Sequence, residues 1–251
     1  MNICIDQGNS RTKIALFRRN GTIHKTFMYK HFSVMDVERL FSLYSISDSI
    51  ISSVVNPEPS VVNALHRLSR TFILFDHTTP VPLENPYETP ETLGLDRLAA
   101  AVGAVGILPD TNLLIIDVGT AITYDFVDKA GGYYGGNIAP GIKMRLHVLK
   151  QMTKKLPLIE VEEDELLPLF GKNTRDAIAA GVIRGVAFET KGYIRTLEER
   201  VDKLQTIITG GYSPFVVRNV QSNLIYEKHL VLKGLNRILE YNKPCEAESK
   251  S

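Results

Sequence analysis

A signature that occurs twice constrains the fold of this chain more than any other feature of its sequence. The apolar run ICI leads into DQGN at residues 6–9, and the apolar run LII leads into DVGT at residues 117–120. Each apolar run predicts a buried strand. Each copy then continues into a second strand-like run, at 12–17 or at 121–127, and into a glycine-containing turn suited to a hairpin.

The spacing is the same for each part of the signature. Asp117 follows Asp6 by 111 residues, Gly119 follows Gly8 by 111, and the hairpin glycine Gly131 follows Asn20 by 111. A shared offset across strand, acidic turn, strand and hairpin turn indicates an internal duplication. The alternative is a chance similarity between two ordinary β-hairpins.

Duplication predicts an α/β protein with two lobes, residues 1–110 and 111–251, which meet near the turn-like segment PDTN. A length of 251 residues exceeds one typical domain and lets each lobe bury a core. Apolar spacing and turn residues predict further strands at 49–55, 71–75 and 204–209, helices at 35–44, 59–70, 94–108, 174–200 and 230–241, and a proline-rich loop at 78–92.

Composition excludes several classes of function. The 29 Lys+Arg and 28 Asp+Glu residues leave a net charge of +1. This value argues against a protein whose main work is non-specific binding to nucleic acid, or binding to membranes through a polybasic surface. The two cysteines, Cys4 and Cys245, form no CxxC pair and fit a reducing cytosol. The N-terminus lacks the features of a secretory signal, and the longest uncharged apolar stretch, 98–109, is too short to span a bilayer. We therefore expect a cytoplasmic protein that binds neither nucleic acid nor membranes.

The first signature has the residue types of a phosphate-binding turn. Gly8 allows a backbone to approach a ligand closely, Asn9 and Ser10 offer short hydrogen-bonding side chains, and Lys13 supplies positive charge. Asp6 ends a buried strand, where a carboxylate is costly unless it meets a cation or strong donors. An acid beside such a turn suits Mg²⁺ on a nucleotide; the alternative is an acid that merely begins a hairpin.

If the chain is duplicated, the DVGT turn is the counterpart of the DQGN turn, and the two turns would face one ligand across a cleft. Two further segments are candidates for the same site. Thr209-Gly210-Gly211 ends another predicted strand, and its glycines admit a nucleoside or form a plain strand-to-helix turn. The segment GGNIAPG at 135–141 shapes a cleft wall or leaves a hairpin without touching a ligand.

The segment GLDR at 94–97 opens a helix that otherwise consists of small apolar residues. Asp96 is placed to accept a proton from a substrate hydroxyl, and Arg97 is suited to bind a carboxylate or phosphate. The alternative for Asp96 is that it only complements the helix dipole. Thr174 is interpreted by default as a helix N-cap.

Common catalytic motifs are missing from the sequence. There is no GxxxxGK[ST] phosphate loop, no GxGxxG after a strand, no GxSxG and no HExxH, and the six histidines form no metal-spaced cluster. These absences disfavour P-loop nucleotide hydrolases, dinucleotide-binding Rossmann domains, serine hydrolases and zinc proteases.

The ordered motifs resemble those of the type III pantothenate kinases, over most of the chain from Asp6 to about Gly211. The resemblance rests on motifs in a fixed order: DQGNSRTK at 6–13, Tyr87, GLDR at 94–97, IDVGTAITYD at 116–125, GGNIAPG at 135–141, Thr174 within NTRDAIAAG, and TGG at 209–211. That family belongs to the superfamily of acetate kinase, sugar kinases, heat-shock chaperone ATPases and actin. The resemblance therefore implies two duplicated ribonuclease-H-like lobes around a central cleft.

The resemblance also implies roles for individual residues. The ATP phosphate loop would comprise Asp6, Gln7, Gly8, Asn9, Ser10, Arg11, Thr12 and Lys13, with Thr120 contacting ATP as well. Asp96 would be the general base. Tyr87, Gly94, Leu95 and Arg97 would contact pantothenate, together with Thr174 from the partner in a homodimer. Asp117 would bind a monovalent cation, K⁺ or NH₄⁺, and Mg²⁺ would accompany ATP.

The expected reaction is the phosphorylation of pantothenate by ATP to 4′-phosphopantothenate, the first step of coenzyme A synthesis. Two alternatives remain open at this point. One is a kinase or phosphohydrolase of the same fold that acts on another small alcohol or phosphate. The other is a regulatory protein that has kept the fold and lost catalysis.

Overall fold

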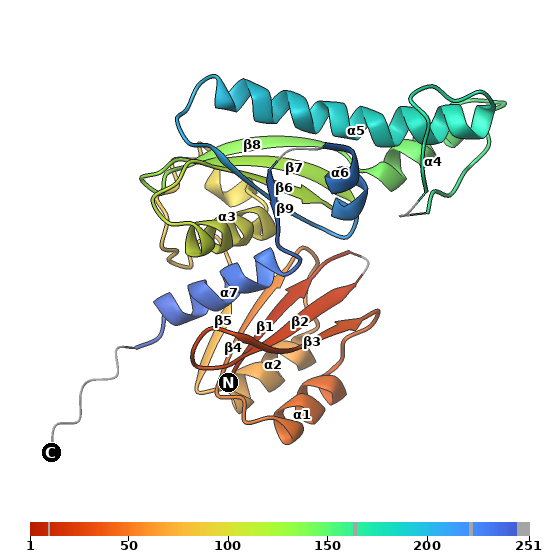
Figure 1. Cartoon of the computed structure of the whole chain (residues 1–251). Helices are drawn as coiled ribbons and strands as arrows, with labels where there is room; N and C mark the ends of the chain where they lie inside the picture. The colour runs from red at the N-terminus through yellow and green to blue at the C-terminus, as the bar shows by residue number, and fades with distance from the viewer. Residues whose placement is uncertain (10, 163–164, 221–222, 245–251) are drawn as a thin grey trace, which may run out of the picture. The chain divides into compact units, whose positions relative to one another are not determined.

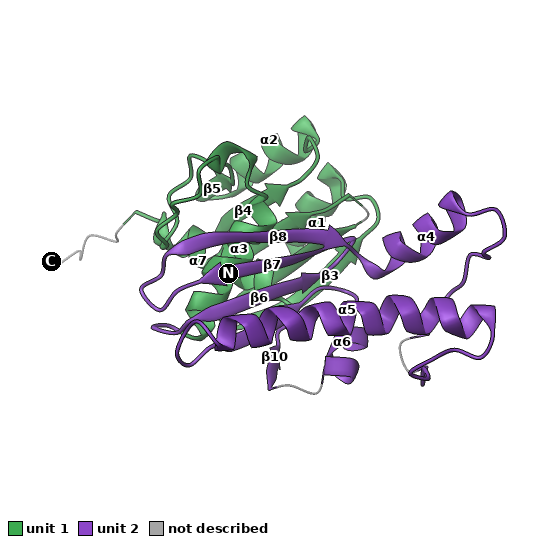
Figure 2. Cartoon of the chain, turned by 90° about the horizontal axis from the view of Figure 1, so that it is seen from above, with its two compact units in different colours: residues 1–108, 229–251 green, residues 109–228 purple. Residues whose placement is uncertain are grey.

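The computed structural model describes residues 1–9, 11–162, 165–220 and 223–244. The chain divides into two compact units (Figure 2). Unit 1 comprises residues 1–108 together with the C-terminal segment from His229, and unit 2 comprises Pro109–Lys228. No helix among the described residues is long and apolar enough to cross a membrane.

Unit 1 is a five-stranded sheet with helices on its faces (Figure 1). The strand order is β3-β2-β1-β4-β5, with β1–β2 and β2–β3 antiparallel and β1–β4 and β4–β5 parallel. Its elements are β1 (Asn2–Gln7), β2 (Thr12–Phe17), β3 (Ile23–Tyr29), α1 (Val34–Leu43), β4 (Asp48–Ser53), α2 (Pro59–Leu68), β5 (Thr71–Leu74), the short 3₁₀ helix η1 (Pro90–Thr92), α3 (Leu95–Ile107) and α7 (Leu230–Tyr241).

Unit 2 repeats this topology. The strand order is β10-β9-β6-β7-β8, so that β6, β7, β8, β9 and β10 occupy the places of β1 to β5 with the same parallel and antiparallel neighbours. The duplicated α/β fold expected from the repeated signature is thereby confirmed. The elements of unit 2 are β6 (Leu113–Val118), β7 (Ala121–Val127), β8 (Tyr133–Pro140), α4 (Ile142–Met152), α5 (Thr174–Glu198), β9 (Gln205–Thr209), α6 (Ser213–Val220) and β10 (Leu224–Tyr226).

The offset between the two copies changes inside the first hairpin. Gln7 pairs with Thr12, whereas Val118 pairs with Ile122, so the first turn is one residue longer than the second. Beyond the turn the offset is therefore 110. Gly21 and Gly131 are the equivalent hairpin glycines, with φ of 76° and 88°. The alignment of Asn20 with Gly131 was therefore wrong by one residue.

Alternation along the strands of unit 1 sends apolar side chains to one face. The fully buried side chains Ile3, Ile5, Ile14, Leu16 and Ile51 form one cluster with side chains of α1 and α2. These two helices cover that face of the sheet (Figure 1). Because side chains alternate along a strand, the intervening residues point to the opposite face, which α7 covers.

Polar contacts tie α7 to the first unit. Asn2 Nδ2 donates to Asn236 Oδ1 at 2.7 Å, and the Lys243 ammonium lies 3.1 Å from the buried Asp48 carboxylate. Gly234 packs so close to Ala99 of α3 that it leaves no space for a Cβ. The lobe boundaries expected from sequence placed Leu230–Tyr241 in the second lobe, whereas this helix packs in unit 1.

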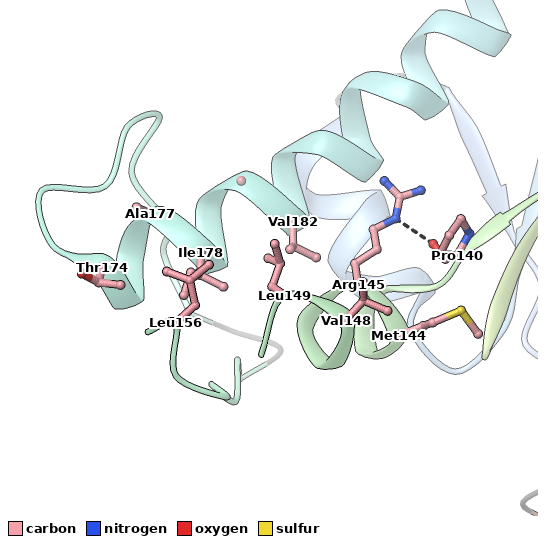
Figure 3. Close-up of a pocket in the computed structure, with 11 residues that line it drawn as sticks. Pro140, Met144, Arg145, Val148, Leu149, Leu156, Thr174, Ala177, Ile178 and Val182 are labelled. Carbon is pink, nitrogen blue, oxygen red and sulfur yellow. Dashed lines mark hydrogen bonds between the residues drawn. The ribbon is translucent and has the colours of Figure 1, made fainter. Parts of the chain in front are cut away.

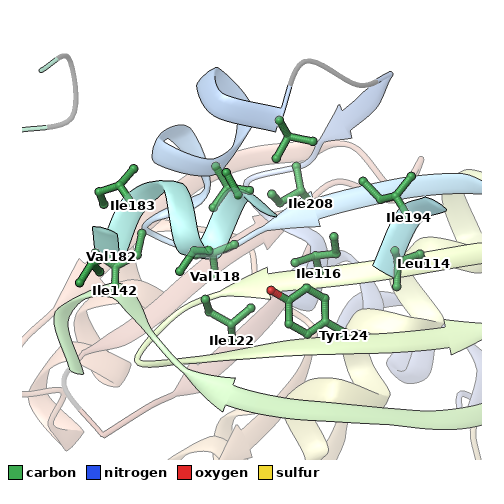
Figure 4. Close-up of a cluster of buried hydrophobic side chains, with 14 of the residues drawn as sticks. Leu114, Ile116, Val118, Ile122, Tyr124, Ile142, Val182, Ile183, Ile194 and Ile208 are labelled. Carbon is green, nitrogen blue, oxygen red and sulfur yellow. The ribbon is translucent and has the colours of Figure 1, made fainter. Parts of the chain in front are cut away.

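Unit 2 has a separate core between its sheet and α5 (Figure 4). Ile116, Val118 and Ile208 of the central strands contact the buried face of α5, and Tyr124 stacks on Tyr193 with ring centroids 4.1 Å apart. α5 is long enough to cover this sheet and to continue past it toward α4 (Figure 2). Each unit thus holds its own strand ends in place without the other unit's core.

Candidate functional site

The β1–β2 turn carries the first signature at the carboxyl end of β1. The Gly8 N–H donates to the Arg11 carbonyl at 3.1 Å, which closes the turn and leaves Asn9 and Arg11 exposed. Gln7 Oε1 accepts a hydrogen bond from Ser53 Oγ at 3.0 Å, which anchors the turn to β4. Ser10, the remaining residue of the expected phosphate loop, lies outside the described residues.

Asp6 has an unusual electrostatic environment for a surface-accessible turn. Burial raises its pKa to about 6; the positive charge of Lys13 opposes this rise and the negative charge of Asp96 adds to it. Lys13 lies directly opposite Asp6 in the β1–β2 register, on the same face of the sheet. The Asp96 carboxylate therefore lies close enough to Asp6 within unit 1 to contribute to the raised pKa of Asp6.

The GLDR segment forms the first turn of α3, with Gly94 at the N-cap position. The Asp96 Oδ1 atom accepts a hydrogen bond from the Arg97 backbone N–H at 2.9 Å. A Cβ on residue 94 would lie 2.6 Å from this oxygen, so glycine is needed for the observed position of the carboxylate. Arg97 is buried, and Leu95 and Tyr87 are half-buried beside the proline-rich loop.

In unit 2 three of the sequence motifs meet at the carboxyl end of β6. The Gly141 N–H donates to the Thr120 carbonyl at 3.1 Å, so the end of GGNIAPG lies against the DVGT turn. Gly210 adopts φ +99°, and a Cβ at this position would overlap with Asp117 Oδ1 and the Val118 carbonyl. Most of the GGNIAPG segment is strand β8, which pairs with β7 and so leaves the β7–β8 hairpin as one of the two interpretations expected. The other interpretation, a cleft wall, stays a prediction.

The TGG segment is a strand-to-helix turn between β9 and α6. The Tyr212 N–H donates to the Val118 carbonyl at 2.9 Å, and Ser213 Oγ donates to the Gly210 carbonyl at 2.6 Å. A cavity of about 210 Å³ lies beside this turn, between α4, the 158–162 segment and the aromatic rings of Tyr212 and Phe215. The segment is therefore a strand-to-helix turn, the second of the two interpretations left open for it. A nucleoside beside its glycines stays a prediction, for which the cavity leaves room.

Thr174 is the first residue of α5, and the residue before it caps the helix. The Asn173 side chain accepts from the Asp176 backbone N–H at 2.9 Å, so the default interpretation of Thr174 as the N-cap was wrong. Thr174 is exposed at one end of a cavity of about 720 Å³ between α4 and α5 (Figure 3).

This cavity, here called the α4–α5 groove, is mainly apolar. Its lining residues are Pro140, Met144, Arg145, Val148, Leu149, Leu156, Thr174, Ala177, Ile178, Gly181 and Val182. Arg145 is held along the groove, because its Nε donates to the Pro140 carbonyl and its guanidinium pairs with Glu189 at 2.6 Å (Figure 3). Nothing in the sequence pattern had singled out this groove, since its residues come from two helices and the segment that joins them.

Sequence reasoning also missed Ser52. Its hydroxyl is buried and has no hydrogen-bond partner among the described residues, and its backbone lies beside that of Asp6 in the β1–β4 register. The signal was a polar residue within the otherwise buried strand SIISS, which a search for apolar periodicity ignores.

Comparison with known proteins identifies the kind of protein that carries these features. The family model for type III pantothenate kinase matches residues 2–196. The type III pantothenate kinase of Phocaeicola vulgatus is 43% identical over 242 residues, which cover 96% of this chain and 99% of that protein. The type III pantothenate kinase of Bacteroides fragilis is 41% identical over 96% of this chain and 98% of its own length.

Solved structures show the same fold at low sequence identity. A putative 2-dehydro-3-deoxygalactonokinase from Sinorhizobium meliloti aligns with a TM-score of 0.60 at 13% identity, covering 97% of this chain and all of that one. A putative N-acetylmannosamine kinase from Listeria monocytogenes aligns with a TM-score of 0.54 at 13% identity, covering 96% and 99%. The fold is therefore that of the actin-like ATPases and sugar kinases.

Proposed function

This chain belongs to the type III pantothenate kinase family, and from that premise we propose which of its residues carry out the reaction. The enzyme phosphorylates pantothenate with ATP to give 4′-phosphopantothenate, the first step of coenzyme A synthesis. One observation carries the assignment of the residues: the Asp96 carboxylate lies close enough to Asp6 within unit 1 to contribute to the raised pKa of Asp6. A phosphate turn and an acceptor base must be neighbours for transfer between their ligands.

The phosphate loop of this proposal runs from Asp6 to Lys13, with Thr120 as a further ATP contact from unit 2. Phosphoryl transfer depends mainly on positioning and on neutralising charge. Lys13 places positive charge on the same sheet face as Asp6, and the exposed Asn9 and Arg11 offer side-chain donors at the turn that the Gly8 N–H closes. Gln7 and Thr12 form the last strand pair that holds the turn in place.

Asp96 is the general base of this proposal. Its Oδ1 is occupied by the Arg97 backbone N–H, and no described residue donates to its Oδ2. That oxygen accepts the proton of the primary hydroxyl while the hydroxyl oxygen bonds to the γ-phosphorus and the bond between that phosphorus and the ADP oxygen breaks. Gly94 keeps the carboxylate in place by leaving room for it.

The pantothenate pocket of this proposal uses the residues around Asp96. The buried guanidinium of Arg97 is suited to bind the pantothenate carboxylate, because Arg forms paired hydrogen bonds with carboxylates. Tyr87, Gly94 and Leu95 would form the wall beside the pantoyl group. Tyr87 and Leu95 are half-buried, so each keeps part of its surface for a ligand.

Two cations complete the charge balance of this proposal. Mg²⁺ would arrive with ATP and neutralise phosphate charge. A monovalent cation, K⁺ or NH₄⁺, would bind at Asp117. The donors fit a hard cation, because the Asp117 carboxylate and the Val118 carbonyl both face Gly210.

The proposed active form is a homodimer in which the partner supplies Thr174. The α4–α5 groove that Thr174 adjoins is apolar, and the exposed groove side chains of Met144 and Val148 are 41% and 46% accessible. Large exposed apolar surfaces mark interaction sites. We also place the enzyme in the cytoplasm, where the buried Cys4 thiol stays reduced.

A coupled assay of ADP release tests the proposal as a whole. ADP release should depend on pantothenate and should be faster in K⁺ or NH₄⁺ than in Na⁺. Faster turnover with another small hydroxy acid than with pantothenate would move the acceptor assignment to a different kinase of the same fold. A rate of ADP release that is the same in K⁺, NH₄⁺ and Na⁺ would contradict the proposed role of Asp117.

A further inference from the structure

Three polar side chains form one row across the unit 1 sheet. In the strand registers Lys13 of β2 lies opposite Asp6 of β1, and Asp6 lies beside Ser52 of β4. Residues that are directly paired across neighbouring strands point to the same face. The row therefore reads Lys13, Asp6, Ser52 at the carboxyl end of β1, next to the phosphate turn.

Ser52 differs from its neighbours in β4 in having an unused hydroxyl. Ser49 Oγ bonds Ser69 Oγ at 2.6 Å, and Ser53 Oγ donates to Gln7 Oε1 at 3.0 Å. The Ser52 residue is 1% exposed, and its Oγ has no partner among the described residues. A buried polar group without a partner destabilises a fold by about 1–3 kcal/mol, so its presence requires an explanation.

Asp6 offers the complementary group. No side chain of the described part of the chain donates a hydrogen bond to its carboxylate. A buried donor and a half-buried acceptor thus occupy neighbouring strand positions without a hydrogen bond between them. Neighbouring strands of a sheet lie about 4.8 Å apart, so side chains at paired positions on one face are within reach of a hydrogen bond.

We propose that Ser52 is the positioning residue of Asp6, and that its hydroxyl donates a hydrogen bond to the Asp6 carboxylate when nucleotide occupies the phosphate loop. This inference rests on the proposed role of Asp6 in that loop. Because the bond forms in the bound state and not in the free one, its free energy adds to nucleotide affinity. The free enzyme keeps both groups unpaired and is less stable for it.

The test compares two alanine variants that each remove an unpartnered buried hydroxyl. Ser60 Oγ is buried and unpartnered like Ser52 Oγ. Ser60 lies in the first turn of helix α2, however, and so is not paired with an acid across a sheet. Ser52→Ala and Ser60→Ala should both be at least as heat-stable as the parent chain. Only Ser52→Ala should raise KM for ATP, by about tenfold, with KM for pantothenate unchanged.

Two measurements separate a positioning role from a structural one. The rise in Tm produced by ATP with Mg²⁺ should need about tenfold more nucleotide in Ser52→Ala, and Ser52→Thr, which keeps the hydroxyl, should restore the parent response. Unchanged nucleotide response in Ser52→Ala beside a weakened one in Asp6→Asn would overturn this inference and leave the phosphate loop intact. An unchanged response in both variants would overturn the role of Asp6 as well. A fall in Tm of Ser52→Ala with both KM values raised would assign Ser52 to structure and also overturn the inference.

Discussion

Gly94 and Asp96 are matched to each other: a Cβ at position 94 would lie 2.6 Å from the Oδ1 atom of Asp96. This oxygen is also held by the Arg97 backbone N–H at 2.9 Å, so the carboxylate has a defined place at the start of α3. The relationship explains why the helix begins with glycine, since the N-cap side chains that usually stabilise a helix start would displace the acid.

Gly94→Ala should therefore impair catalysis far more than folding. The added methyl group forces the short Asp96 side chain to rotate, and a displacement of about 1 Å in a reacting group costs about 100-fold in rate. We expect kcat to fall by about that factor with Tm nearly unchanged. Gly192→Ala is the control, because a Cβ there meets nothing within 4 Å; it should keep full activity and gain about 0.5–1 kcal/mol. Full activity in Gly94→Ala would contradict the proposed place of the base.

Asp96→Asn should remove the base while keeping the shape of the side chain. General base catalysis contributes about 100- to 10,000-fold, so kcat should fall within that range. KM for ATP should change less than twofold, because Asp96 belongs to the acceptor pocket in this proposal. Steady-state kinetics with each substrate varied in turn, together with circular dichroism to confirm folding, check both statements. Turnover near that of the parent would remove Asp96 from its role.

Asp6→Asn should stabilise the free enzyme at neutral pH. The folded-state pKa of Asp6, about 6, lies above its unfolded value, so the folded state prefers the protonated acid. The stability associated with this preference is fully present below about pH 4 and is lost as the pH rises through 6. The ionised form then costs up to about 3 kcal/mol at pH 8. Urea unfolding without nucleotide should show the largest gain of Asp6→Asn at pH 8 and almost none at pH 4; an equal gain at both would refute the pKa assignment.

Asp48→Asn should destabilise unit 1. Burial alone would raise the pKa of Asp48, but hydrogen bonds from Arg70, Ser47 and Lys243 outweigh it and hold the pKa well below the usual range. Stability of this origin is present above pH 4 and is lost as the pH falls through the folded-state value. We expect a loss of about 2–3 kcal/mol at pH 7 that shrinks at pH 3.

A surface ion pair provides the comparison for Asp48. Glu38 pairs with Arg67 at 2.9 Å, but both side chains are more than half exposed. Glu38→Gln should change the free energy of unfolding by less than about 1 kcal/mol at either pH. A loss in Glu38→Gln as large as that in Asp48→Asn would show that general charge balance, and not the buried carboxylate, stabilises the unit.

Val148→Glu should prevent association through the α4–α5 groove. A buried, unpaired carboxylate in an apolar interface is strongly unfavourable. Sedimentation should show a monomer, with KM for pantothenate raised and binding of ATP retained. Val217 of α6 is 36% exposed and lies outside the groove, so Val217→Glu should remain dimeric and active. A dimeric, active Val148→Glu enzyme would move the interface elsewhere.

Much of the fold was predictable because it depends on local patterns. Alternating apolar residues and glycine turns marked β1, β2, β6 and β7, and the duplicated signature implied one topology for both units. The strands β3, β8 and β10 and the helices α4 and α6 were missed. Their apolar residues occupy too few turns to establish a period, and contacts with the rest of unit 2 decide their conformation.

The site residues divide in the same way, into motifs that are visible in a few consecutive residues and contacts between segments far apart in the sequence. Motifs of a few residues, such as GLDR and DVGT, were recognisable because glycine, acid and hydroxyl must occur at set spacings within one turn. The meeting of Gly141, Gly210 and the Thr120 turn was not predictable from spacing, because strand order brings together segments that are about 20 to 90 residues apart.

The amino-acid sequence by itself determined the two copies, their strands and the turns that bear Asp6, Asp96 and Asp117. Only the tertiary structure decided that the helix Leu230–Tyr241 packs in unit 1 and that Ser52 lies beside Asp6. The physical reason is that the periodicity of a strand determines the face of the sheet to which a side chain points. Which residue lies beside it on that face depends on the strand register, which the packing of the whole sheet sets.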